Sequence, residues 1–212
     1  MATAPIFNSY SGLQSAVARY MNRTDLGPDI PGFIAIAESR IALDLRHWQM
    51  VQPLMLTAPA ADGWVRVPDD WLEWDHVTVG QRLLEYATPE QFWRAAGPPD
   101  SFNRRADQYT MEGAMLLVAA PSTDPNATDI DVQATYYARI PALNDTDPAG
   151  WLLTQFPMVY LYGSLVSACE FVKDDSRAQG WAAQYQASVQ ALNSGSTKAL
   201  TSGSPLRMRP PR

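Results

Sequence analysis

Catalysis by a Ser-His-Asp triad would require one of the two histidines of this chain, His47 or His76, to face both a carboxylate and a nucleophile. Asp75 directly precedes His76 in a segment with strand-like alternation, and neighbouring side chains of a regular strand point to opposite faces. His47 lies near the end of a predicted helix, where a protonated imidazole is favoured by the helix C-terminus. A G-x-S-x-G nucleophile motif is absent from the sequence. These features do not support a Ser-His-Asp hydrolase.

Acidic residues gather just before His76, where the stretch "PDDWLEWD" contains Asp69, Asp70 and Glu73. Paired carboxylates can hydrolyse glycosidic bonds, and the two tryptophans of this stretch could form a platform for a sugar. The other interpretation is a turn that enters a strand whose tryptophans are partly buried. We favour the turn, and keep a small hydrolase built on these acids and His76 as a competing hypothesis.

Motifs for cofactors and metals are missing. The only cysteine, Cys169, excludes an internal disulfide and a multi-cysteine metal site. The stretch from Asp124 has the spacing of a calcium loop at its start, but Asp129 replaces the glycine at the sixth position and Thr135 replaces the glutamate at the twelfth. Neither a phosphate-binding glycine loop nor a dinucleotide fingerprint occurs. We therefore expect no cofactor, no metal and no enzymatic activity.

The composition is that of a globular protein with a substantial core, because 46% of the 212 residues are hydrophobic and 18% are charged. The net charge of −6 argues against binding to the phosphate backbone of nucleic acids, which requires clustered cations. The most apolar stretch, residues 151–172, contains too short an apolar run for a membrane span, which needs roughly 20 such residues. No signal peptide is recognised at the N-terminus, so we expect synthesis in the cytoplasm and no membrane association.

Helical periodicity appears towards both ends of the chain. It predicts a short helix at 11–21, a second from about Asp29 that includes His47, a third at 157–172 and a last one from 175 to about 193. The predicted buried stripe of the second helix consists of Ile34, Ala37, Ile41, Leu45 and Trp48. The third helix is apolar on all sides, which predicts that other helices enclose it.

Strand periodicity replaces helical periodicity between residues 49 and 140, where short runs of β-formers alternate with turn residues. Glu112-Gly113 is a plausible hairpin turn between two of these runs. The stretch "TPEQFWRAA" interrupts them with a helical turn or two, which Thr88 and Gln91 would start as a capping box.

We therefore predict an α+β protein: a four-helix bundle with an inserted β-rich module and a flexible C-terminal tail. The predicted parts are N-terminal bundle helices at 1–48, the β-rich module at 49–140, C-terminal bundle helices at 141–194 and a basic tail at 195–212. The side chains expected in the bundle core or at a subunit interface are Trp151, Leu152, Met158, Tyr160, Leu161, Leu165, Phe171, Trp181 and Tyr185.

Several stretches together resemble one protein family, the head-to-tail adaptor proteins of tailed bacteriophages, also called connector or head completion proteins. The resemblance runs from about residue 9 to 194, and the general plan is similar to that of the tail tubular A proteins of short-tailed phages. The matching stretches include "YSGLQSAVARYMNRTDLGPDIPGFIAIAESRIALDLR", "VPDDWLEWDHVTV", "LEYATPEQFW" and "PALNDTDPAGWLLTQFPMVYLYGSL", followed by "KDD" and "YQASVQALN".

The resemblance implies a structural virion protein at the head-tail interface. Adaptors of this type form a closed ring of about twelve copies beneath the portal protein, extend the DNA channel and present a platform to a downstream tail or nozzle protein. DNA would pass through the ring without specific binding. On this hypothesis, the basic tail binds the portal through Leu206, Arg207, Met208, Arg209 and Arg212. The alternative is a carbohydrate- or receptor-binding tail module that uses Trp64, Trp71, Trp74 and Trp93.

Overall fold

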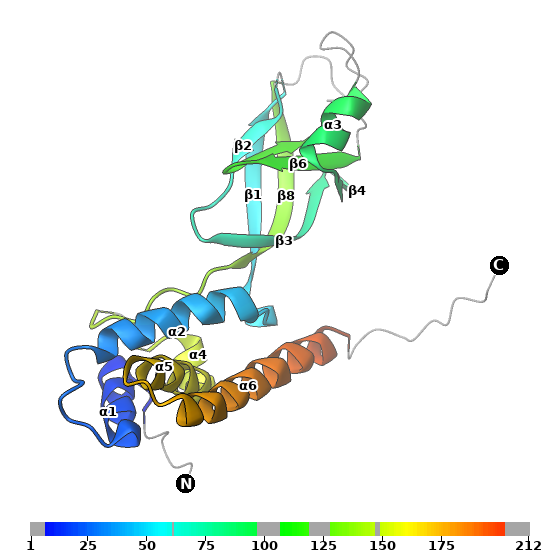
Figure 1. Cartoon of the computed structure of the whole chain (residues 1–212). Helices are drawn as coiled ribbons and strands as arrows, with labels where there is room; N and C mark the ends of the chain where they lie inside the picture. Colours follow the sequence, from blue (N-terminus) through cyan, green and yellow to red (C-terminus); the bar gives the residue numbers. More distant parts are fainter. Residues whose placement is uncertain (1–6, 61, 97–106, 119–127, 147–148, 202–212) are drawn as a thin grey trace, which may run out of the picture. The chain divides into compact units, whose positions relative to one another are not determined.

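The computed structural model describes residues 7–60, 62–96, 107–118, 128–146 and 149–201. These residues form two compact units (Figure 1). One unit comprises the described residues within 1–48 and 140–212, and it is helical. The other comprises the described residues within 49–139 and consists mostly of strands. We refer to them as the helical unit and the β unit.

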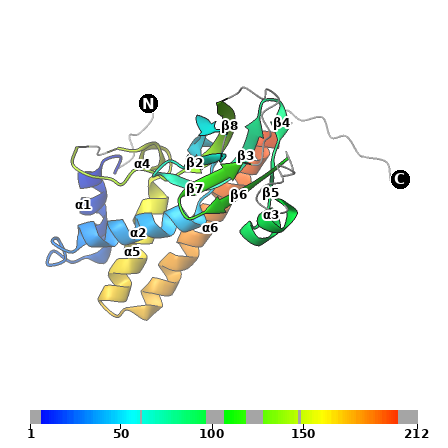
Figure 2. The same cartoon turned by 90° about the horizontal axis from the view of Figure 1, so that it is seen from above.

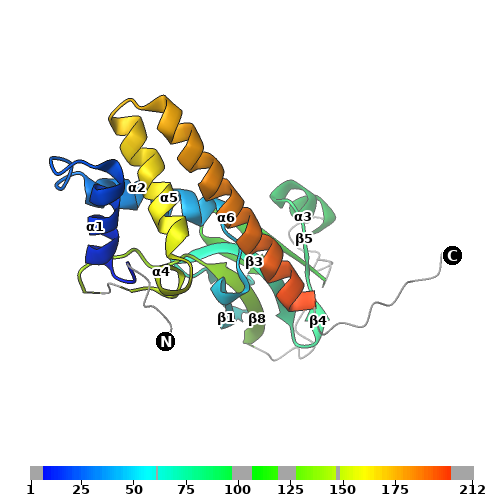
Figure 3. The same cartoon turned by 90° about the horizontal axis from the view of Figure 1, so that it is seen from below.

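The helical unit is organised around one central helix. Its helices are α1 (Tyr10–Met21), α2 (Ile30–Asp44), α4 (Trp151–Gln155), α5 (Pro157–Phe171) and α6 (Asp175–Thr201). Each of the other four packs against α5, which lies beside α6 in Figure 3. Every residue of α5 from Val159 to Cys169 is buried except Tyr162. The prediction that other helices enclose this apolar segment is therefore confirmed.

The mixed class of the fold is confirmed, with helices and two sheets. The four-helix bundle is not confirmed, because the helices pack as neighbours of α5 and include the short additional helix α4. The predicted helices at 11–21 and 157–172 are present. The prediction was wrong at the end of α6, since residues 195–201, expected in the flexible tail, continue the helix.

Side-chain hydrogen bonds explain why α6 continues past its polar segment. The Asn193 side chain donates to the backbone carbonyl of Asp44 at 2.9 Å and accepts from the backbone N–H of Arg46 at 2.8 Å. The backbone N–H of Trp48 donates to the buried hydroxyl of Ser196 at 2.8 Å. These contacts satisfy backbone groups at and beyond the end of α2, and they hold α6 in place there.

Local sequence sets the starts of the helices. The Ser9 hydroxyl accepts from the backbone N–H of Gly12 at 3.2 Å and caps α1. Before α6, the backbone of Lys173 is left-handed with φ of 59°, and the Asp174 carboxylate accepts from the backbone N–H of Arg177 at 3.2 Å. The polar segment between α5 and α6 therefore ends one helix and caps the next.

The β unit contains two four-stranded sheets (Figure 2). The first has the order β1-β8-β3-β4 and the second has the order β2-β7-β6-β5. All strand pairs are antiparallel except β5 and β6, which are parallel. The strands are β1 (Val51–Pro59), β2 (Trp64–Arg66), β3 (Trp71–Val79), β4 (Arg82–Leu83), β5 (Glu85–Tyr86), β6 (Gln108–Glu112), β7 (Met115–Val118) and β8 (Asp129–Ala138). A 3₁₀ turn, η1 (Trp48–Met50), precedes β1.

Alternation along the strands builds a separate core in the β unit. In β8 the side chains of Ile130, Val132 and Ala134 are buried, whereas Asp129 and Asp131 are exposed. The buried side chains of this core come from both sheets: Ala58, Val67, Val77, Leu84, Leu116, Val118, Ile130, Val132 and Ala134. The strand pattern predicted for the middle of the chain is confirmed.

Two predicted local motifs of the β unit are also present. Gly113, with φ of 60°, lies in the hairpin turn between β6 and β7. The helix α3 (Pro89–Ala96) begins with a capping box. Its Thr88 hydroxyl accepts from the backbone N–H of Gln91, and the Gln91 side chain accepts from the backbone N–H of Thr88, both at 3.3 Å.

Candidate functional site

The polar cluster around His76 lies on the exposed side of the first sheet and does not have the geometry of a catalytic triad. A β-bulge between Trp74 and His76 breaks the alternation, so Asp75 contacts His76 at 3.2 Å instead of pointing to the opposite face as predicted. The Thr135 hydroxyl lies 2.8 Å from Nδ1 of His76 and 3.0 Å from the Asp75 carboxylate. Because carboxylate and hydroxyl both meet Nδ1, the imidazole does not relay a proton between them.

The acids before this cluster take part in separate surface contacts. Asp69 forms an ion pair with Arg66 at 2.9 Å, and Asp70 accepts from the phenol of Tyr136 at 3.1 Å. Burial, and then the hydrogen bond to Asp70, raise the pKa of Tyr136. Among the described residues, no group of three or more His, Cys, Asp and Glu side chains could hold a metal ion. The arrangement is that of a turn that enters β3, the interpretation favoured from the sequence.

The tryptophans of the β unit are mostly packing residues. Trp71 and Trp74 lie against each other with ring centroids 5.7 Å apart, and the indole of Trp74 donates to the sulfur of Met111 at 3.3 Å. Trp64 packs against the small cluster of Ala87, Phe92 and Leu117. Three of the four tryptophans proposed as a carbohydrate platform are therefore partly buried.

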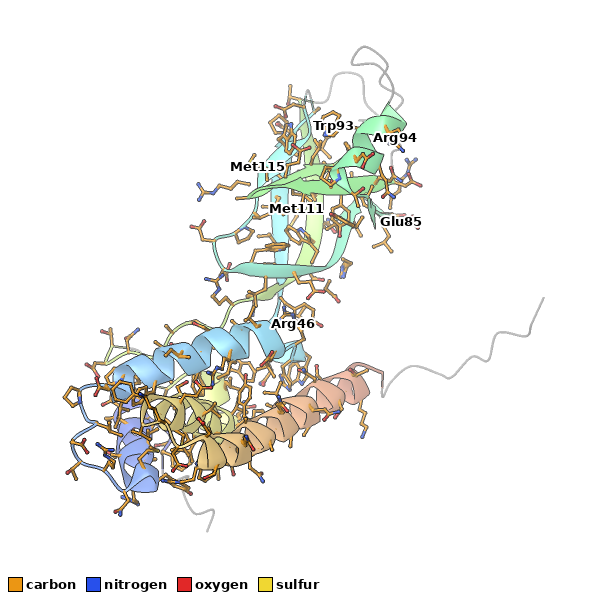
Figure 4. The ribbon with its side chains drawn as sticks, viewed as in Figure 1. Arg46, Glu85, Trp93, Arg94, Met111 and Met115 are labelled. Carbon is orange, nitrogen blue, oxygen red and sulfur yellow. The ribbon has the colours of Figure 1, made fainter. Side chains whose placement is uncertain are left out.

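Trp93 on α3 is the one of these four tryptophans that is exposed, at 44% (Figure 4). Its indole N–H donates to the Glu112 carboxylate at 2.6 Å. The next residue, Arg94, pairs with Glu90 at 2.6 Å along the same helix. A single exposed ring held by a carboxylate does not amount to the predicted platform.

The residues predicted for the core or a subunit interface divide into two groups. Leu152, Tyr160, Leu161, Leu165 and Tyr185 are buried in the helical unit. Trp151 and Trp181 are half-buried. Met158 and Phe171, at the two ends of α5, are 43% and 58% exposed, so they are not core residues. Trp48, predicted in the buried stripe of α2, lies in η1 and is also exposed.

Gly163 lies where three helices meet. A Cβ atom at this position would be 3.0 Å from the Cβ of Ala37 on α2 and 3.5 Å from the ring of Tyr185 on α6. A larger side chain would therefore push α2 or α6 away from α5. Nearby, Cys169 is buried with its sulfur 3.8 Å from that of Met21, and burial raises the pKa of its thiol. This cysteine is a packing residue.

Burial shifts the pKa values of two side chains in the helical unit, His47 and Glu38. The imidazole of His47 stacks on Trp151 at 5.3 Å and meets Phe156 edge-on at 5.9 Å. The helix α2 ends at Asp44, so His47 lies beyond the helix end at which the sequence placed it, and burial lowers its pKa. Burial also raises the pKa of Glu38, although its carboxylate accepts from the backbone N–H of Leu143 at 2.7 Å.

The helical unit exposes several large apolar side chains. On α2, Ile36 and Leu43 are 47% and 78% exposed. Sequence analysis did not single them out, because it recorded only the buried stripe of this helix. Their spacing of seven residues, which places both on one helix face, was the available signal. Tyr20, Trp48, Met158 and Phe171 are the other exposed large apolar residues among those described in this unit.

A hollow of about 330 Å³ opens on the surface of α6. It is lined by Arg177, Gly180, Trp181 and Gln184, and most of its wall is apolar. The five tail residues predicted to bind a portal, Leu206, Arg207, Met208, Arg209 and Arg212, lie outside the described residues.

The described residues form a mixed α/β protein of two units, and no catalytic triad or metal-binding cluster lies among them. The SU10 adaptor protein family matches residues 8–209, and the chain belongs to this family of phage head-to-tail adaptors. No curated protein matches the chain.

Family membership places the chain among the structural proteins of bacteriophage virions and implies contacts with phage portal and tail proteins. Adaptors of this kind are typically not enzymes, which agrees with the geometry around His76. Within the described residues, no helix combines the length and the apolar character needed to cross a membrane.

Proposed function

We propose that this chain is one subunit of a closed adaptor ring that joins the portal to the tail and extends the channel for DNA. The observation that carries the proposal is the family match over residues 8–209, which includes both units. Both units therefore belong to the adaptor, and neither is an addition from outside the family. By the resemblance described above, the ring would contain about twelve copies, as a closed cyclic assembly of head-to-tail contacts. Subunits would be present in the host cytoplasm during assembly and would be located at the head-tail interface of the finished virion.

The distribution of charge supports a channel through which DNA slides without being held. Residues 49–139 contain thirteen acidic and six basic residues, whereas the rest of the chain contains nine acidic and ten basic residues. A wall rich in carboxylates repels phosphates and lacks the clustered cations that specific or non-specific DNA binding requires. We propose that the β unit supplies this acidic wall and the platform for the downstream tail or nozzle protein.

The basic tail is proposed to bind the portal. Leu206 and Met208 offer apolar anchors, and Arg207, Arg209 and Arg212 offer guanidinium groups that pair with carboxylates in two-pronged geometry. The assignment places the portal contact at one end of the chain and leaves both folded units free for contacts with neighbouring copies and the tail.

The test mixes the purified full chain with the portal protein of the same phage and images the product by electron microscopy. We expect a ring of about twelve adaptor copies on the portal. Chains that stay unbound under conditions in which the portal is intact would refute the ring.

A second arm compares deletion of residues 203–212 with the triple variant Arg207→Gln, Arg209→Gln and Arg212→Gln. Both should weaken portal binding, because they remove anchors or charges. The matched control is Arg82→Gln, which removes a positive charge from β4 in the β unit. Unchanged portal binding by the deletion variant would refute the role of the tail.

A further inference from the structure

The exposed face of α2 has an unusual composition for a solvated helix. Ile36 and Leu43 project from it two turns apart, and the exposed positions between and before them are Gly32, Ala35 and Ser39. Arg40 lies between Ile36 and Leu43 on this face, but its side chain is 31% exposed and pairs with Glu170 at 2.8 Å. The exposed part of the stripe is otherwise small or apolar, whereas water-facing helix surfaces normally carry several charged residues. The opposite face of α2, with Ile34 and Ile41, is already buried against its own unit. The stripe therefore has the properties of a surface that another protein covers.

The hollow on α6 is an open recess whose wall is mostly apolar. Trp181 forms part of its wall, and its ring is fixed by stacking on Tyr162 at 5.7 Å and by edge contact with Tyr20 at 6.0 Å. Apart from the neighbouring residues and backbone of its own helix, no atom lies within 4 Å of the position that a Cβ at Gly180 would occupy, so the space above this glycine is open. A rigid aromatic wall beside open space can accept an apolar side chain with little loss of conformational entropy.

We propose that Leu43 of one subunit inserts into the hollow beside Trp181 of the next subunit, with Ile36 packing next to it. The inference rests on the proposed ring and names the surfaces that would close it. Leu43 is 78% exposed, so it does not occupy the hollow of its own chain. A projection that fits a recess elsewhere on an identical molecule makes a head-to-tail contact, the type that generates rings.

Charge supports the same pairing. Exposed Asp44 follows Leu43 and accepts from the phenol of Tyr185 at 3.1 Å. Arg177 lines the hollow, and its guanidinium lies 3.8 Å from the Asp174 carboxylate. Arg177 already donates to the backbone carbonyl of Tyr20 at 2.9 Å, and this bond holds the guanidinium at the edge of the recess. With Leu43 inserted, the carboxylate of Asp44 would approach a cation, which adds electrostatic complementarity to the apolar contact.

Cysteine cross-linking tests the contact directly. The variants Leu43→Cys and Gly180→Cys are mixed in equal amounts with the portal protein and treated with a short bismaleimide reagent. The native Cys169 is buried and burial raises the pKa of its thiol, so it contributes little background. The matched control replaces Gly180→Cys with Gln190→Cys, at an exposed position further along α6.

We expect cross-linked dimers from the Leu43→Cys and Gly180→Cys mixture, and a ladder of higher oligomers from the double variant. Cross-linking of Leu43→Cys alone would indicate a symmetric contact and overturn the proposal. An equal yield with Gln190→Cys, or no cross-link in a ring that has formed, would also overturn it. If the unmodified chain forms no ring on the portal, the proposed function itself has failed.

A second pair of variants measures the strength of the contact. Leu43→Asp places a charge in the proposed recess and should weaken ring assembly on the portal by about tenfold or more. Leu43→Met conserves the apolar character and should assemble almost as the unmodified chain does. Leu43 is exposed in the single chain, so circular dichroism and the melting temperature should be unchanged in both variants. Equal assembly by both variants would overturn the proposal.

Discussion

The helical unit and the β unit differ in the balance of acidic and basic residues that they carry. Both units expose large apolar side chains, such as Leu43 in the helical unit and Met55 and Leu83 in the β unit, but the helical unit has almost balanced charge. The β unit carries seven more acidic than basic residues. It also keeps most of its tryptophans packed against neighbours. The difference indicates that the two units meet different kinds of partner.

The two units also have separate interiors. The core of the β unit is built from side chains of its own two sheets, and the core of the helical unit is centred on α5. A protein with two independent cores can change one surface without unfolding the other. In the proposed ring, this separation lets apolar contacts between copies and an acidic channel wall coexist in one chain of 212 residues.

The largest expected effect tests whether the cores are separate. Leu161 on α5 is fully buried, so Leu161→Ala should lower the stability of the helical unit by about 2–5 kcal/mol, since it removes apolar contacts and leaves a cavity. Hydrogen exchange measured by mass spectrometry should show lost protection in peptides of α5 and α6. Peptides of β1, β3 and β8 should keep theirs.

Leu43→Ala is the matched control for this prediction, because the same change at an exposed leucine should alter stability by less than about 0.5 kcal/mol. Equal loss of protection in both units after Leu161→Ala would show that the two cores unfold together, and the comparison would fail.

A smaller effect concerns the close approach of helices at Gly163. Gly163→Val should destabilise the helical unit by about 1–3 kcal/mol, because the new side chain meets Ala37 and Tyr185. Gly195→Ala on α6 is the control, since its added Cβ meets no atom within 4 Å. That change should stabilise the protein by about 0.4–1 kcal/mol. Urea unfolding curves of the two variants should therefore move in opposite directions, and a shift in the same direction would contradict the packing described.

Removing one helix cap in each unit tests the same separation of the cores with a smaller loss of stability, about 1 kcal/mol. Asp174→Ala removes the cap of α6 and Thr88→Ala removes half of the capping box of α3. Each should cost about 0.5–2 kcal/mol. The first should reduce protection in the helical unit and the second in the β unit, as read by hydrogen exchange. Loss of protection in the wrong unit would be evidence against separate cores.

Most of the secondary structure could be predicted from the sequence, because periodicity and caps act locally. The helix at 157–172 is apolar on every side, and the strand pattern of β8 alternates without interruption. Family resemblance was also visible, since the matching stretches extend along nearly the whole chain. Periodicity, caps and matching stretches can all be read from the order of the residues along the chain, without knowledge of tertiary contacts.

The failures came from contacts between distant residues. The segment after Asn193 is rich in glycine and serine, which favours a helix end, yet Asn193 and Ser196 bind backbone groups of the segment at 44–48. The contact of Asp75 with His76 arises from a β-bulge that alternation does not reveal. Met158 and Phe171 lie outside the core, and their place at a subunit interface, the other half of the expectation, stays a prediction.

The smallest expected effect is a change in the pH dependence of stability. It compares His47 in the helical unit with His76 in the β unit. Burial against Trp151 and Phe156 lowers the pKa of His47. As the pH falls through the ordinary value of 6.5, the unfolded chain therefore binds a proton that the folded chain does not. Stability should decrease over this range and level off below the lowered pKa of the folded state.

His47→Phe keeps an aromatic ring at this position and removes the titration. Its urea-unfolding free energy should vary less between pH 7.5 and pH 5.5 than that of the unmodified chain, by about 1 kcal/mol or less. His76→Gln in the β unit is the control, because it removes the other histidine of the chain and leaves His47 in place. If His76→Gln flattened the curve and His47→Phe did not, the buried aromatic site of the helical unit would not be the source of the pH dependence.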